Sequence, residues 1–248
     1  MSRRMRENIN LFYKHLNNFL QEANLNQNEY TSFLKWADRL GRNGEWPLFA
    51  EVFIESSVLK NMYLANKEMT PSFLGPYYVE GAPILDKPYQ LPMRPNEKGE
   101  KLMFSGTVKD ADGTPLNNTL VDMWQVDADG HYSSFDADAP PYNLRGRFYT
   151  DENGSFEVES IVPNQRHIPK DGPTSECLNM IDQHPYRPTY LHFMFKRKDY
   201  ETLITKVYFQ KDESLDVTDD VRSSLMTKLY EKDDHKVASF DFVMLNAE

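Results

Sequence analysis

The chain of 248 residues has little of several features that would place it in a special protein class. Cys177 is its only cysteine, which excludes an internal disulfide and is consistent with a reducing cytoplasm. No apolar run approaches the length of a membrane span, and the basic N-terminus lacks the apolar core of a secretion signal. Lys and Arg number 28 against 38 Asp and Glu, and the net charge of −10 argues against a nucleic-acid partner. We therefore expect a cytoplasmic globular protein.

Residues 1–69 have the pattern of amphipathic helices. Apolar residues recur at helical spacing in residues 9–20 and again in residues 30–37, where Asn26 is a suitable N-terminal cap. Pro47 begins a third helical segment. The aromatic surface of these helices either joins the core of the chain or forms an interface with a second copy. The sequence leaves both alternatives open.

The character of the chain changes after residue 69. Residues 70–100 are rich in Pro and Gly, which predicts a linker or wrapping arm. In residues 101–248, short runs such as LMFSGTV, TLVDMWQV and SFEVESIV alternate with turn signals such as DADG and DENG. Later strands are expected in YLHFMFKRK, TLITKVYF and SFDFVML, with a helical excursion in LDVTDDVRSSLMTKLYEKD. The predicted fold is mainly β, an antiparallel β-sandwich with a helical N-terminal domain.

Three side chains in the β-rich part suggest a metal site. Tyr190 and His192 are two residues apart in a predicted strand, so both side chains lie on one face. With Tyr132 they form a set of two phenols and one imidazole, which suits a hard trivalent metal such as Fe(III). Each residue also has a simpler interpretation. The two tyrosines are then ordinary buried residues, for example with a hydroxyl bonded to a backbone carbonyl, and His192 is an ordinary hydrogen-bonded histidine in a strand.

Several blocks resemble the intradiol ring-cleaving dioxygenases, the family of catechol and hydroxyquinol 1,2-dioxygenases. They are DMWQVDADGHYSSFD, NLRGR, IPKDGPT and RPTYLHF, and IPKDGPT is nearer to the hydroxyquinol and chlorocatechol branch. GEWPLFAEVF is similar to the helical N-terminal domain of the family. GPYYVEGAP resembles the segment that closes over the substrate pocket, which implies pocket positions at Leu74, Pro76 and Tyr77. The resemblance implies a small aromatic diol and dioxygen as substrates, non-haem Fe(III), and a homodimer formed through the N-terminal helices.

The resemblance also implies a ligand set, from which this chain departs at two positions. Tyr132 matches a ligand tyrosine, and His192 matches the second of two ligand histidines. Tyr190 stands where the first histidine is expected, and Arg166 stands where a second ligand tyrosine is expected, followed by His167. Four candidate ligands therefore remain, with two positions changed in type.

Two further positions match the substrate pocket of the family. Arg187 falls on an arginine beside the bound catecholate, and Lys206 falls on a pocket glutamine.

Arg166 has no lone pair to donate, so it cannot replace a ligand tyrosine that takes up a substrate proton.

Three interpretations follow. Iron and ring cleavage are retained, with Tyr190 as the second phenolate and His167 or water as the fourth ligand. Alternatively, the pocket is metal-free or holds another metal, and Arg166, Arg187 and Lys206 bind an anionic aromatic ligand for non-oxidative chemistry. In the third, the chain only binds an aromatic molecule.

Overall fold

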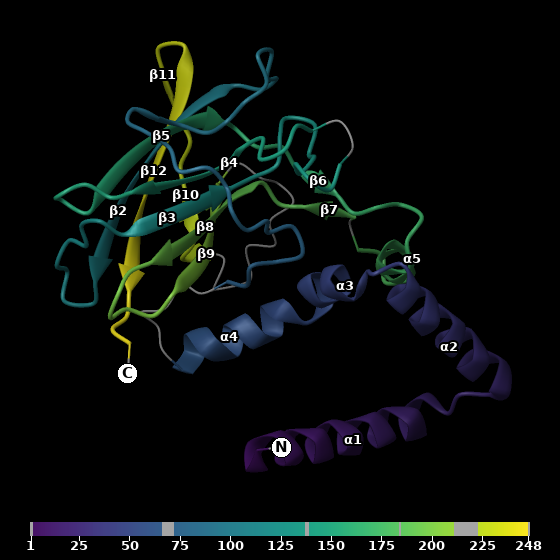
Figure 1. Ribbon diagram of the computed structural model, residues 1–248. Helices are drawn as coiled ribbons and strands as arrows, with labels where there is room; N and C mark the ends of the chain where they lie inside the picture. The colour runs from purple at the N-terminus through teal and green to yellow at the C-terminus, as the bar shows by residue number, and fades with distance from the viewer. Residues whose placement is uncertain (1, 66–71, 137–138, 184, 211–222, 248) are drawn as a thin grey trace. The chain divides into compact units, whose positions relative to one another are not determined.

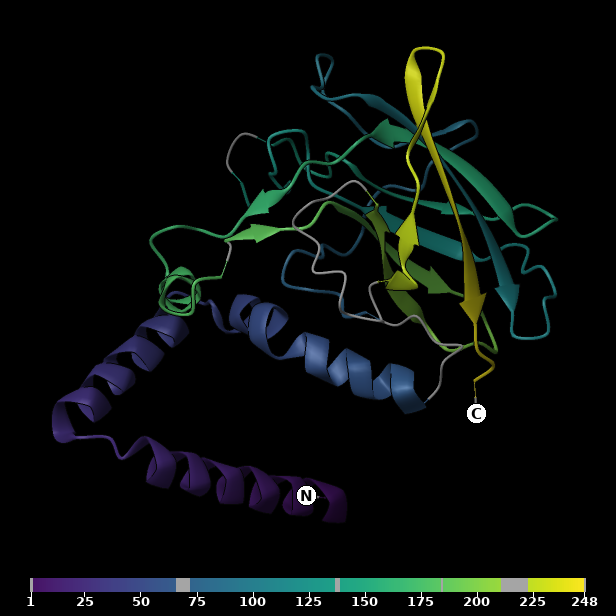
Figure 2. The same cartoon turned by 180° about the vertical axis from the view of Figure 1, so that it is seen from behind.

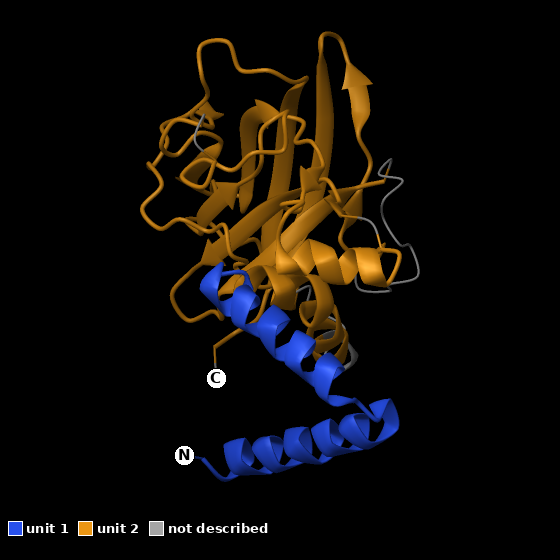
Figure 3. Cartoon of the chain, turned by 90° about the vertical axis from the view of Figure 1, so that its right-hand side faces the viewer, with its two compact units in different colours: residues 1–45 blue, residues 46–248 orange. Residues whose placement is uncertain are grey.

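The computed structural model describes residues 2–65, 72–136, 139–183, 185–210 and 223–247 (Figure 1). The chain forms two compact units, residues 1–45 and residues 46–248, which are coloured separately in Figure 3. The boundaries expected at residues 69 and 100 stay a prediction.

The first unit consists of two helices with strong N-terminal caps. In α1 (Arg3–Ala23) the Ser2 side chain accepts a hydrogen bond from the Met5 amide. In α2 (Gln27–Arg42) Asn26 and Glu29 form a reciprocal capping box, which confirms the expected start of this helix. No residue of α1 is buried, although its sequence is amphipathic. The apolar face of α1 therefore has no cover within its own unit.

The second unit begins with two short helices rather than the single helical segment expected after Pro47. They are α3 (Trp46–Phe53) and α4 (Glu55–Ala65), which meet at Ile54. Leu48 of α3 packs against Leu178 of α5 (Pro173–Met180), a helix that the sequence pattern did not predict. This contact anchors α3 to the β-rich part of its own unit.

Two five-stranded sheets form the body of the second unit, as Figures 1 and 2 show from opposite sides. The first sheet has the order β1 (Tyr89–Gln90), β5 (Ser155–Ile161), β2 (Lys101–Asp110), β12 (His235–Met244) and β11 (Tyr230–Lys232). The second has the order β10 (Met226–Thr227), β9 (Leu203–Phe209), β8 (Tyr190–Lys196), β3 (Leu120–Trp124) and β4 (Arg145–Tyr149). A third, two-stranded sheet pairs β6 (Arg166–His167) with β7 (Tyr186–Arg187).

The predicted β-sandwich is confirmed, but its sheets are mixed rather than purely antiparallel. Strands β12 and β2 pair in parallel over nine residue pairs, and the short edge strands β1 and β10 also pair in parallel with their neighbours. The tail returns beside β2 by a long connection, which a parallel pair requires. The alternation in the sequence predicts a strand and its buried face, but not the direction of its partner.

Aromatic side chains from both sheets fill the space between them. Phe104 and Phe242 of the first sheet lie 5.2 and 5.1 Å, between ring centroids, from Phe193 of the second. All three rings are fully buried. Each ring lies on the face of its strand that points toward the other sheet, since side chains alternate between the two faces of a strand.

The segment LDVTDDVRSSLMTKLYEKD differs from its predicted helical structure. Residues 215–222 lie outside the described residues. From Met226 onward the chain instead forms β10 and β11, which pair with β9 and β12. The helical prediction is therefore wrong for residues 226–232, because tertiary pairing outweighs local propensity there.

Candidate active site on the outer face of the second sheet

The two faces of β8 carry different kinds of side chain. Leu191, Phe193 and Phe195 point into the core between the sheets. Tyr190 and His192 therefore point to the outer face, as the alternation predicts. They are only 6% and 2% exposed, so this outer face is itself covered by other parts of the chain.

Neighbouring strands hold the His192 ring in place. His192 lies opposite Trp124 of β3 and opposite Lys206 of β9 in the two ladders. Its ring stacks on Trp124 with centroids 4.6 Å apart and an interplanar angle of 10°. The Tyr190 ring meets His192 edge to face at 4.8 Å. These contacts pre-orient the imidazole.

Tyr132 reaches the same place from the loop after β3. Its ring is 1% exposed and lies 6.4 Å, between centroids, from His192. The Tyr132 amide donates to Asp136 Oδ2 at 2.8 Å. Arg145 Nε donates to Ser133 Oγ at 2.7 Å, and its guanidinium lies 5.5 Å from the Tyr132 ring. The structure thus brings Tyr132, Tyr190 and His192 together.

A glycine turn sets the spacing between the Tyr132 loop and Arg166. Gly130 has a φ of +83°, and a Cβ built there would lie 2.5 Å from the Gln165 carbonyl oxygen and 3.5 Å from Arg166 Cα. An L side chain is therefore excluded on both conformational and steric grounds. The Asp-Gly turn allows the loop that carries Tyr132 to pack directly on the strand that carries Arg166.

Arg166 points into the site. Its guanidinium carbon lies 3.9 Å from the Tyr77 ring centroid and 5.1 Å from that of Tyr132. Its NH1 group is 3.3 Å from Asp136 Oδ2. The same carboxylate oxygen thus holds both the Tyr132 amide and the Arg166 cation. Arg166 therefore places a cation beside the phenol of Tyr132. The family resemblance implies a tyrosine ligand at this position instead.

Lys206 is the second cation of the site, and the sequence did not indicate its partner. Its Nζ lies 3.1 Å from Glu51 Oε1, and both side chains are 7% exposed. The Tyr190 hydroxyl donates to the same oxygen at 3.4 Å. Glu51 comes from α3, 155 residues before Lys206 in the chain. It is an ordinary helical glutamate in the sequence, so only its tertiary position could identify it.

Burial and neighbouring charges shift the pKa values of these groups. Burial, followed by the nearby Tyr190 and Glu51, raises the pKa of Tyr132 well above that of an ordinary phenol. Burial and the charge of Glu51 raise the pKa of Tyr190 in the same direction. Burial and the charge of Lys206 lower the pKa of His192, which favours a neutral imidazole. Burial lowers the pKa of Lys206, but Glu51 outweighs it and keeps the ammonium charged.

The two-stranded sheet separates Arg166 from His167. The ring of His167 packs on Tyr186 at 4.0 Å between centroids, whereas Arg166 faces Tyr77 and Tyr132. Adjacent residues of a strand point to opposite faces. His167 thus has the strand geometry in which it points away from the other candidate ligands. Arg187 lies directly opposite Arg166 in the β6–β7 ladder, which directs both side chains to the same face.

The arm before β1, which carries Leu74, Pro76 and Tyr77, packs over the site. Tyr77 stacks on Tyr132 with ring centroids 4.8 Å apart, and Leu74 packs against the cluster that contains Tyr132 and Trp124. Pro76 lies between them and is half-buried. A Cβ built on the neighbouring Gly75 would lie 3.9 Å from the His192 ring. The arm therefore passes directly over the imidazole.

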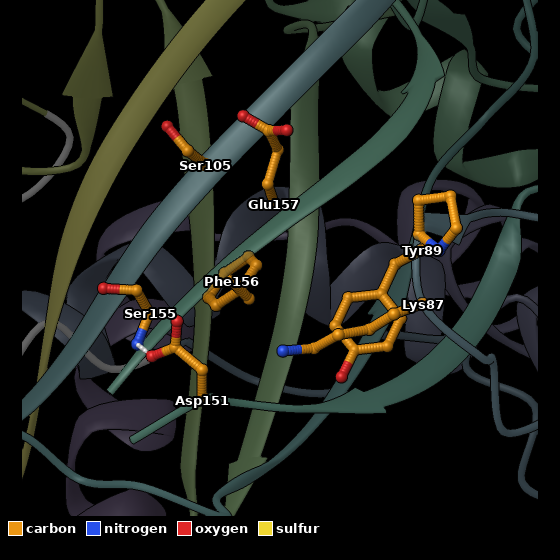
Figure 4. A pocket seen from close by; sticks show the side chains of 8 residues that line it. Lys87, Tyr89, Ser105, Asp151, Ser155, Phe156 and Glu157 are labelled. Carbon is orange, nitrogen blue, oxygen red and sulfur yellow. Dashed lines mark hydrogen bonds between the residues drawn. The ribbon is translucent and has the colours of Figure 1, made fainter. Parts of the chain in front are cut away.

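A separate pocket of about 710 Å³ lies on the first sheet (Figure 4). Its side chains include Lys87, Tyr89 and Glu157, and Asp151 there accepts a hydrogen bond from the Ser155 amide. None of the candidate residues of the outer-face site lines it. Its polar groups belong to a turn and a strand edge, so the outer-face site remains the candidate.

Comparison with known proteins decides the family. The sequence pattern of the family described as Dioxygenase matches residues 73–246, and that described as Catechol dioxygenase N terminus matches residues 2–70. The chain belongs to the intradiol ring-cleavage dioxygenase family. Enzymes of this family use non-haem ferric iron, and the family resemblance noted in the sequence is confirmed.

Individual relatives agree with this assignment. A chlorocatechol 1,2-dioxygenase of Rhodococcus opacus is 37% identical over 204 residues, which cover 81% of this chain and 79% of the relative. A 6-chlorohydroxyquinol 1,2-dioxygenase of Cupriavidus pinatubonensis is 33% identical over 93% of this chain and 87% of its own length. The crystal structure of 3-chlorocatechol 1,2-dioxygenase from Rhodococcus opacus has a TM-score of 0.90 at 34% identity, covering 98% of this chain and 99% of that one.

The residues present fit a ferric ion in donor type. No cluster of three His, Cys, Asp or Glu side chains occurs among the described residues, so such a site depends on the tyrosines. Tyr132, Tyr190 and Glu51 supply hard oxygen atoms, and Nδ1 of His192 is buried without a hydrogen-bond partner. Hard oxygen donors with imidazole suit trivalent iron. The cations Arg166 and Lys206 each have a carboxylate neighbour, Asp136 and Glu51 respectively, which limits their repulsion of a metal.

Within the described residues, no helix is long and apolar enough to cross a membrane.

Proposed function

We propose that this intradiol dioxygenase cleaves a catechol- or hydroxyquinol-type diol at a modified ferric site. The observation that carries the proposal is the convergence of Tyr132, Tyr190 and His192 under the arm of Tyr77. The names of the relatives support the substrate class, since they include chlorocatechol and 6-chlorohydroxyquinol dioxygenases. We propose Tyr132, Tyr190 and His192 as metal ligands. His167 is left out of this set because its ring packs on Tyr186.

Three cations are proposed to bind and orient the substrate. Arg166 lies 5.1 Å from the Tyr132 ring centroid and Lys206 lies 4.8 Å from that of Tyr190, while Arg187 is opposite Arg166 in the β6–β7 ladder. A catecholate carries negative charge on adjacent oxygens. Arg166 and Arg187 are opposite one another in a ladder, so both guanidinium groups add positive charge to the same face, where Asp136 already pairs with Arg166. The two oxygens of a diolate would add further negative charge beside these cations. Leu74, Pro76 and Tyr77 are proposed to form an apolar wall for the aromatic ring.

The reaction breaks the ring bond between the two hydroxylated carbons. Both atoms of dioxygen enter the product, which is a muconate-type dicarboxylic acid, and no external reductant is needed. Bound ferric iron would supply electron withdrawal from the catecholate oxygens. The chain itself would exclude water through the arm over His192 and hold the diolate against Arg166.

A second function is favoured by the two buried cations of the site. Arg166 and Lys206 are 9% and 6% exposed, and their carboxylate neighbours Asp136 and Glu51 hold both cations in the pocket without any metal. In this alternative the site holds an anionic aromatic molecule without iron, and Tyr and His side chains carry out non-oxidative chemistry or none.

One preparation distinguishes the two functions. The protein is loaded with ferric iron, its metal is measured by elemental analysis, and it is mixed with catechol or hydroxyquinol with and without oxygen. The dioxygenase function predicts a wine-red protein and uptake of one dioxygen per ring cleaved. A colourless protein that holds no iron, consumes no oxygen and still binds catechol anaerobically by calorimetry would overturn it in favour of the second function.

We also propose a cytoplasmic homodimer formed through α1 and α2. The support is the large apolar surface of these helices, where Phe12, Phe19 and Phe33 are 69%, 53% and 49% exposed. Such surface is a common feature of protein interfaces. The single cysteine supports the reducing location.

A further inference from the structure

Glu51 occupies an unusual position for a helical glutamate. Its side chain is 7% exposed and its Oε1 lies 3.4 Å from the Tyr190 hydroxyl. The Tyr132 ring lies 6.4 Å, between centroids, from His192, which the Tyr190 ring also contacts, so both phenols surround the same imidazole. His192 meets the other side of the Tyr190 ring edge. A carboxylate therefore stands where phenols and an imidazole already converge.

The contact with Lys206 does not exhaust what this carboxylate can bind. Oε1 accepts from Lys206 and Tyr190, but a carboxylate has two oxygens and about four lone-pair sites. One oxygen can hold the ammonium while the other binds a metal. A carboxylate hydrogen-bonded in this way is oriented like other metal ligands that depend on a supporting partner.

We propose that Glu51 is the fourth protein ligand of the ferric ion, alongside Tyr132, Tyr190 and His192. This inference rests on the proposed iron-dependent function. Ligand positions that hold a tyrosine and a histidine in the family hold Arg166 and Tyr190 here, which leaves one donor too few. Glu51 restores the number from a different element, α3. Three anionic ligands balance the triple charge of ferric iron, and the buried Lys206 provides the positive charge that offsets the additional carboxylate.

The competing explanation gives Glu51 only the role of a counter-charge for Lys206. The two explanations differ when both residues are neutralised together. If Glu51 only balances the ammonium, the double variant E51Q/K206Q should bind ferric iron like the wild type. If Glu51 is a ligand, iron binding should stay weak in the double variant, since the neutral amide of Gln does not replace an anionic carboxylate donor.

The experiment measures metal binding without using activity. Wild type, E51Q, K206Q, E51Q/K206Q and the control E55Q are loaded with ferric iron or with redox-inert gallium(III). Glu55 is a suitable control because the charge of Lys206 also acts on it, whereas the hydroxyl of Tyr190 donates to Glu51. Bound metal is measured by elemental analysis, the phenolate-to-iron band by absorption, and gallium binding by the shift in melting temperature.

We expect E51Q and E51Q/K206Q to bind ferric iron at least on the order of tenfold more weakly than wild type, with a shifted absorption band. E55Q and K206Q should retain the metal. Full metal binding and an unchanged band in the double variant would overturn Glu51 as a ligand while leaving the iron-dependent function intact. A wild-type protein that binds neither metal would overturn the iron-dependent function itself, and Glu51 as a ligand with it. If E51Q does not fold, the double variant E51Q/K206Q, which leaves no buried charge without a partner, is compared with K206Q instead.

Discussion

Lys206 and Glu51 form a buried ion pair, with Nζ and Oε1 3.1 Å apart. Lys206 lies on β9 of the second sheet and Glu51 on α3. Because both side chains are only 7% exposed, neither can be hydrated if its partner is removed. The pair therefore joins α3 to β9 and sets the charge of the candidate active site at the same time.

Removal of one member of this pair should strongly destabilise the second unit. We expect Glu51→Ala to lower the free energy of unfolding by about 3–5 kcal/mol, since it leaves a buried ammonium without a partner. The single variant Lys206→Met should lose a similar amount, and the double variant Glu51→Ala with Lys206→Met should lose much less than the sum of the two. Urea unfolding of the two single variants and the double variant forms a double-mutant cycle that isolates the pair. Additive losses would show that the pair is not coupled.

Tyr190→Phe should remove ferric iron binding and leave the fold intact. The change deletes only a hydroxyl, and the ring contacts to His192 and Tyr208 remain. Iron content and the wine-red absorption report the result, and circular dichroism reports the fold. Tyr208→Phe is the matched control, because Tyr208 lies beside Tyr190 on β9 but outside the proposed ligand set. Retained colour and metal in Tyr190→Phe would exclude Tyr190 as a ligand.

Arg166→Gln should weaken substrate binding more than it slows turnover. Its guanidinium faces Tyr77 and Tyr132 and is proposed to hold the diolate. Loss of a charge-assisted contact to a bound anion is expected to raise KM by about tenfold, with a smaller change in kcat. Oxygen-uptake kinetics over a range of catechol concentrations separate the two constants. The control Arg197→Gln removes a guanidinium that lies over Tyr200, outside the site. An unchanged KM in Arg166→Gln would argue against contact with substrate.

Asp122 should make stability depend on pH. Burial raises its pKa to about 6, with the Tyr78 hydroxyl bonded to Oδ2 at 3.0 Å opposing this shift. A carboxyl whose pKa is higher in the folded state is most favourable when protonated. Its contribution is fully present below pH 4 and is lost as the pH rises through about 6. The loss should reach about 3 kcal/mol. Asp122→Asn should thus be more stable than wild type at pH 8 and no more stable at pH 4. Equal unfolding midpoints at pH 8 would contradict this assignment.

Phe12→Glu should dissociate the proposed homodimer. Phe12 is 69% exposed in α1, and the helical spacing places it on one face with Ile9, Leu16 and Phe19. A carboxylate there would be buried unpaired in an interface. Analytical ultracentrifugation of the variant should give the mass of one chain where the wild type gives two. Asn18→Glu, on the opposite face of the same helix, should leave the mass unchanged. Dimers that persist in Phe12→Glu would move the interface elsewhere.

Local patterns in the sequence predicted most of the sandwich. Alternating runs and Asp-Gly turns predicted β2, β3, β5, β8 and β9, because the period of two and the turn residues are both local signals. The parallel pairing of β12 with β2 and the short strand β10 were missed, since strand direction and partner depend on contacts far along the chain. Helix α5 was missed for a related reason: Pro173 and Gly172 read as a loop before its packing against Leu48 is known.

Local patterns also predicted part of the candidate site, but they missed the residues that enter it through tertiary contacts. The Tyr190 and His192 pair was visible because alternation relates positions two apart on one strand. Glu51 was invisible because a glutamate in an amphipathic helix normally faces solvent. The placement of His167 away from the phenols follows from a two-residue strand that no sequence pattern announces. Tertiary contact, rather than residue type, decides which charged groups enter the site.

The two faces of β8 have consequences for how this protein can change over evolutionary time. Leu191, Phe193 and Phe195 hold the sandwich together, while Tyr190 and His192 lie on the opposite face of the same seven-residue strand, at the candidate site. A substitution on the outer face leaves every interior contact of the strand in place. The scaffold can therefore retain its architecture through successive replacements of ligands and pocket groups. Changes at Tyr190 or His192 thus alter the outer face of the strand, while its interior positions continue to hold the two sheets together.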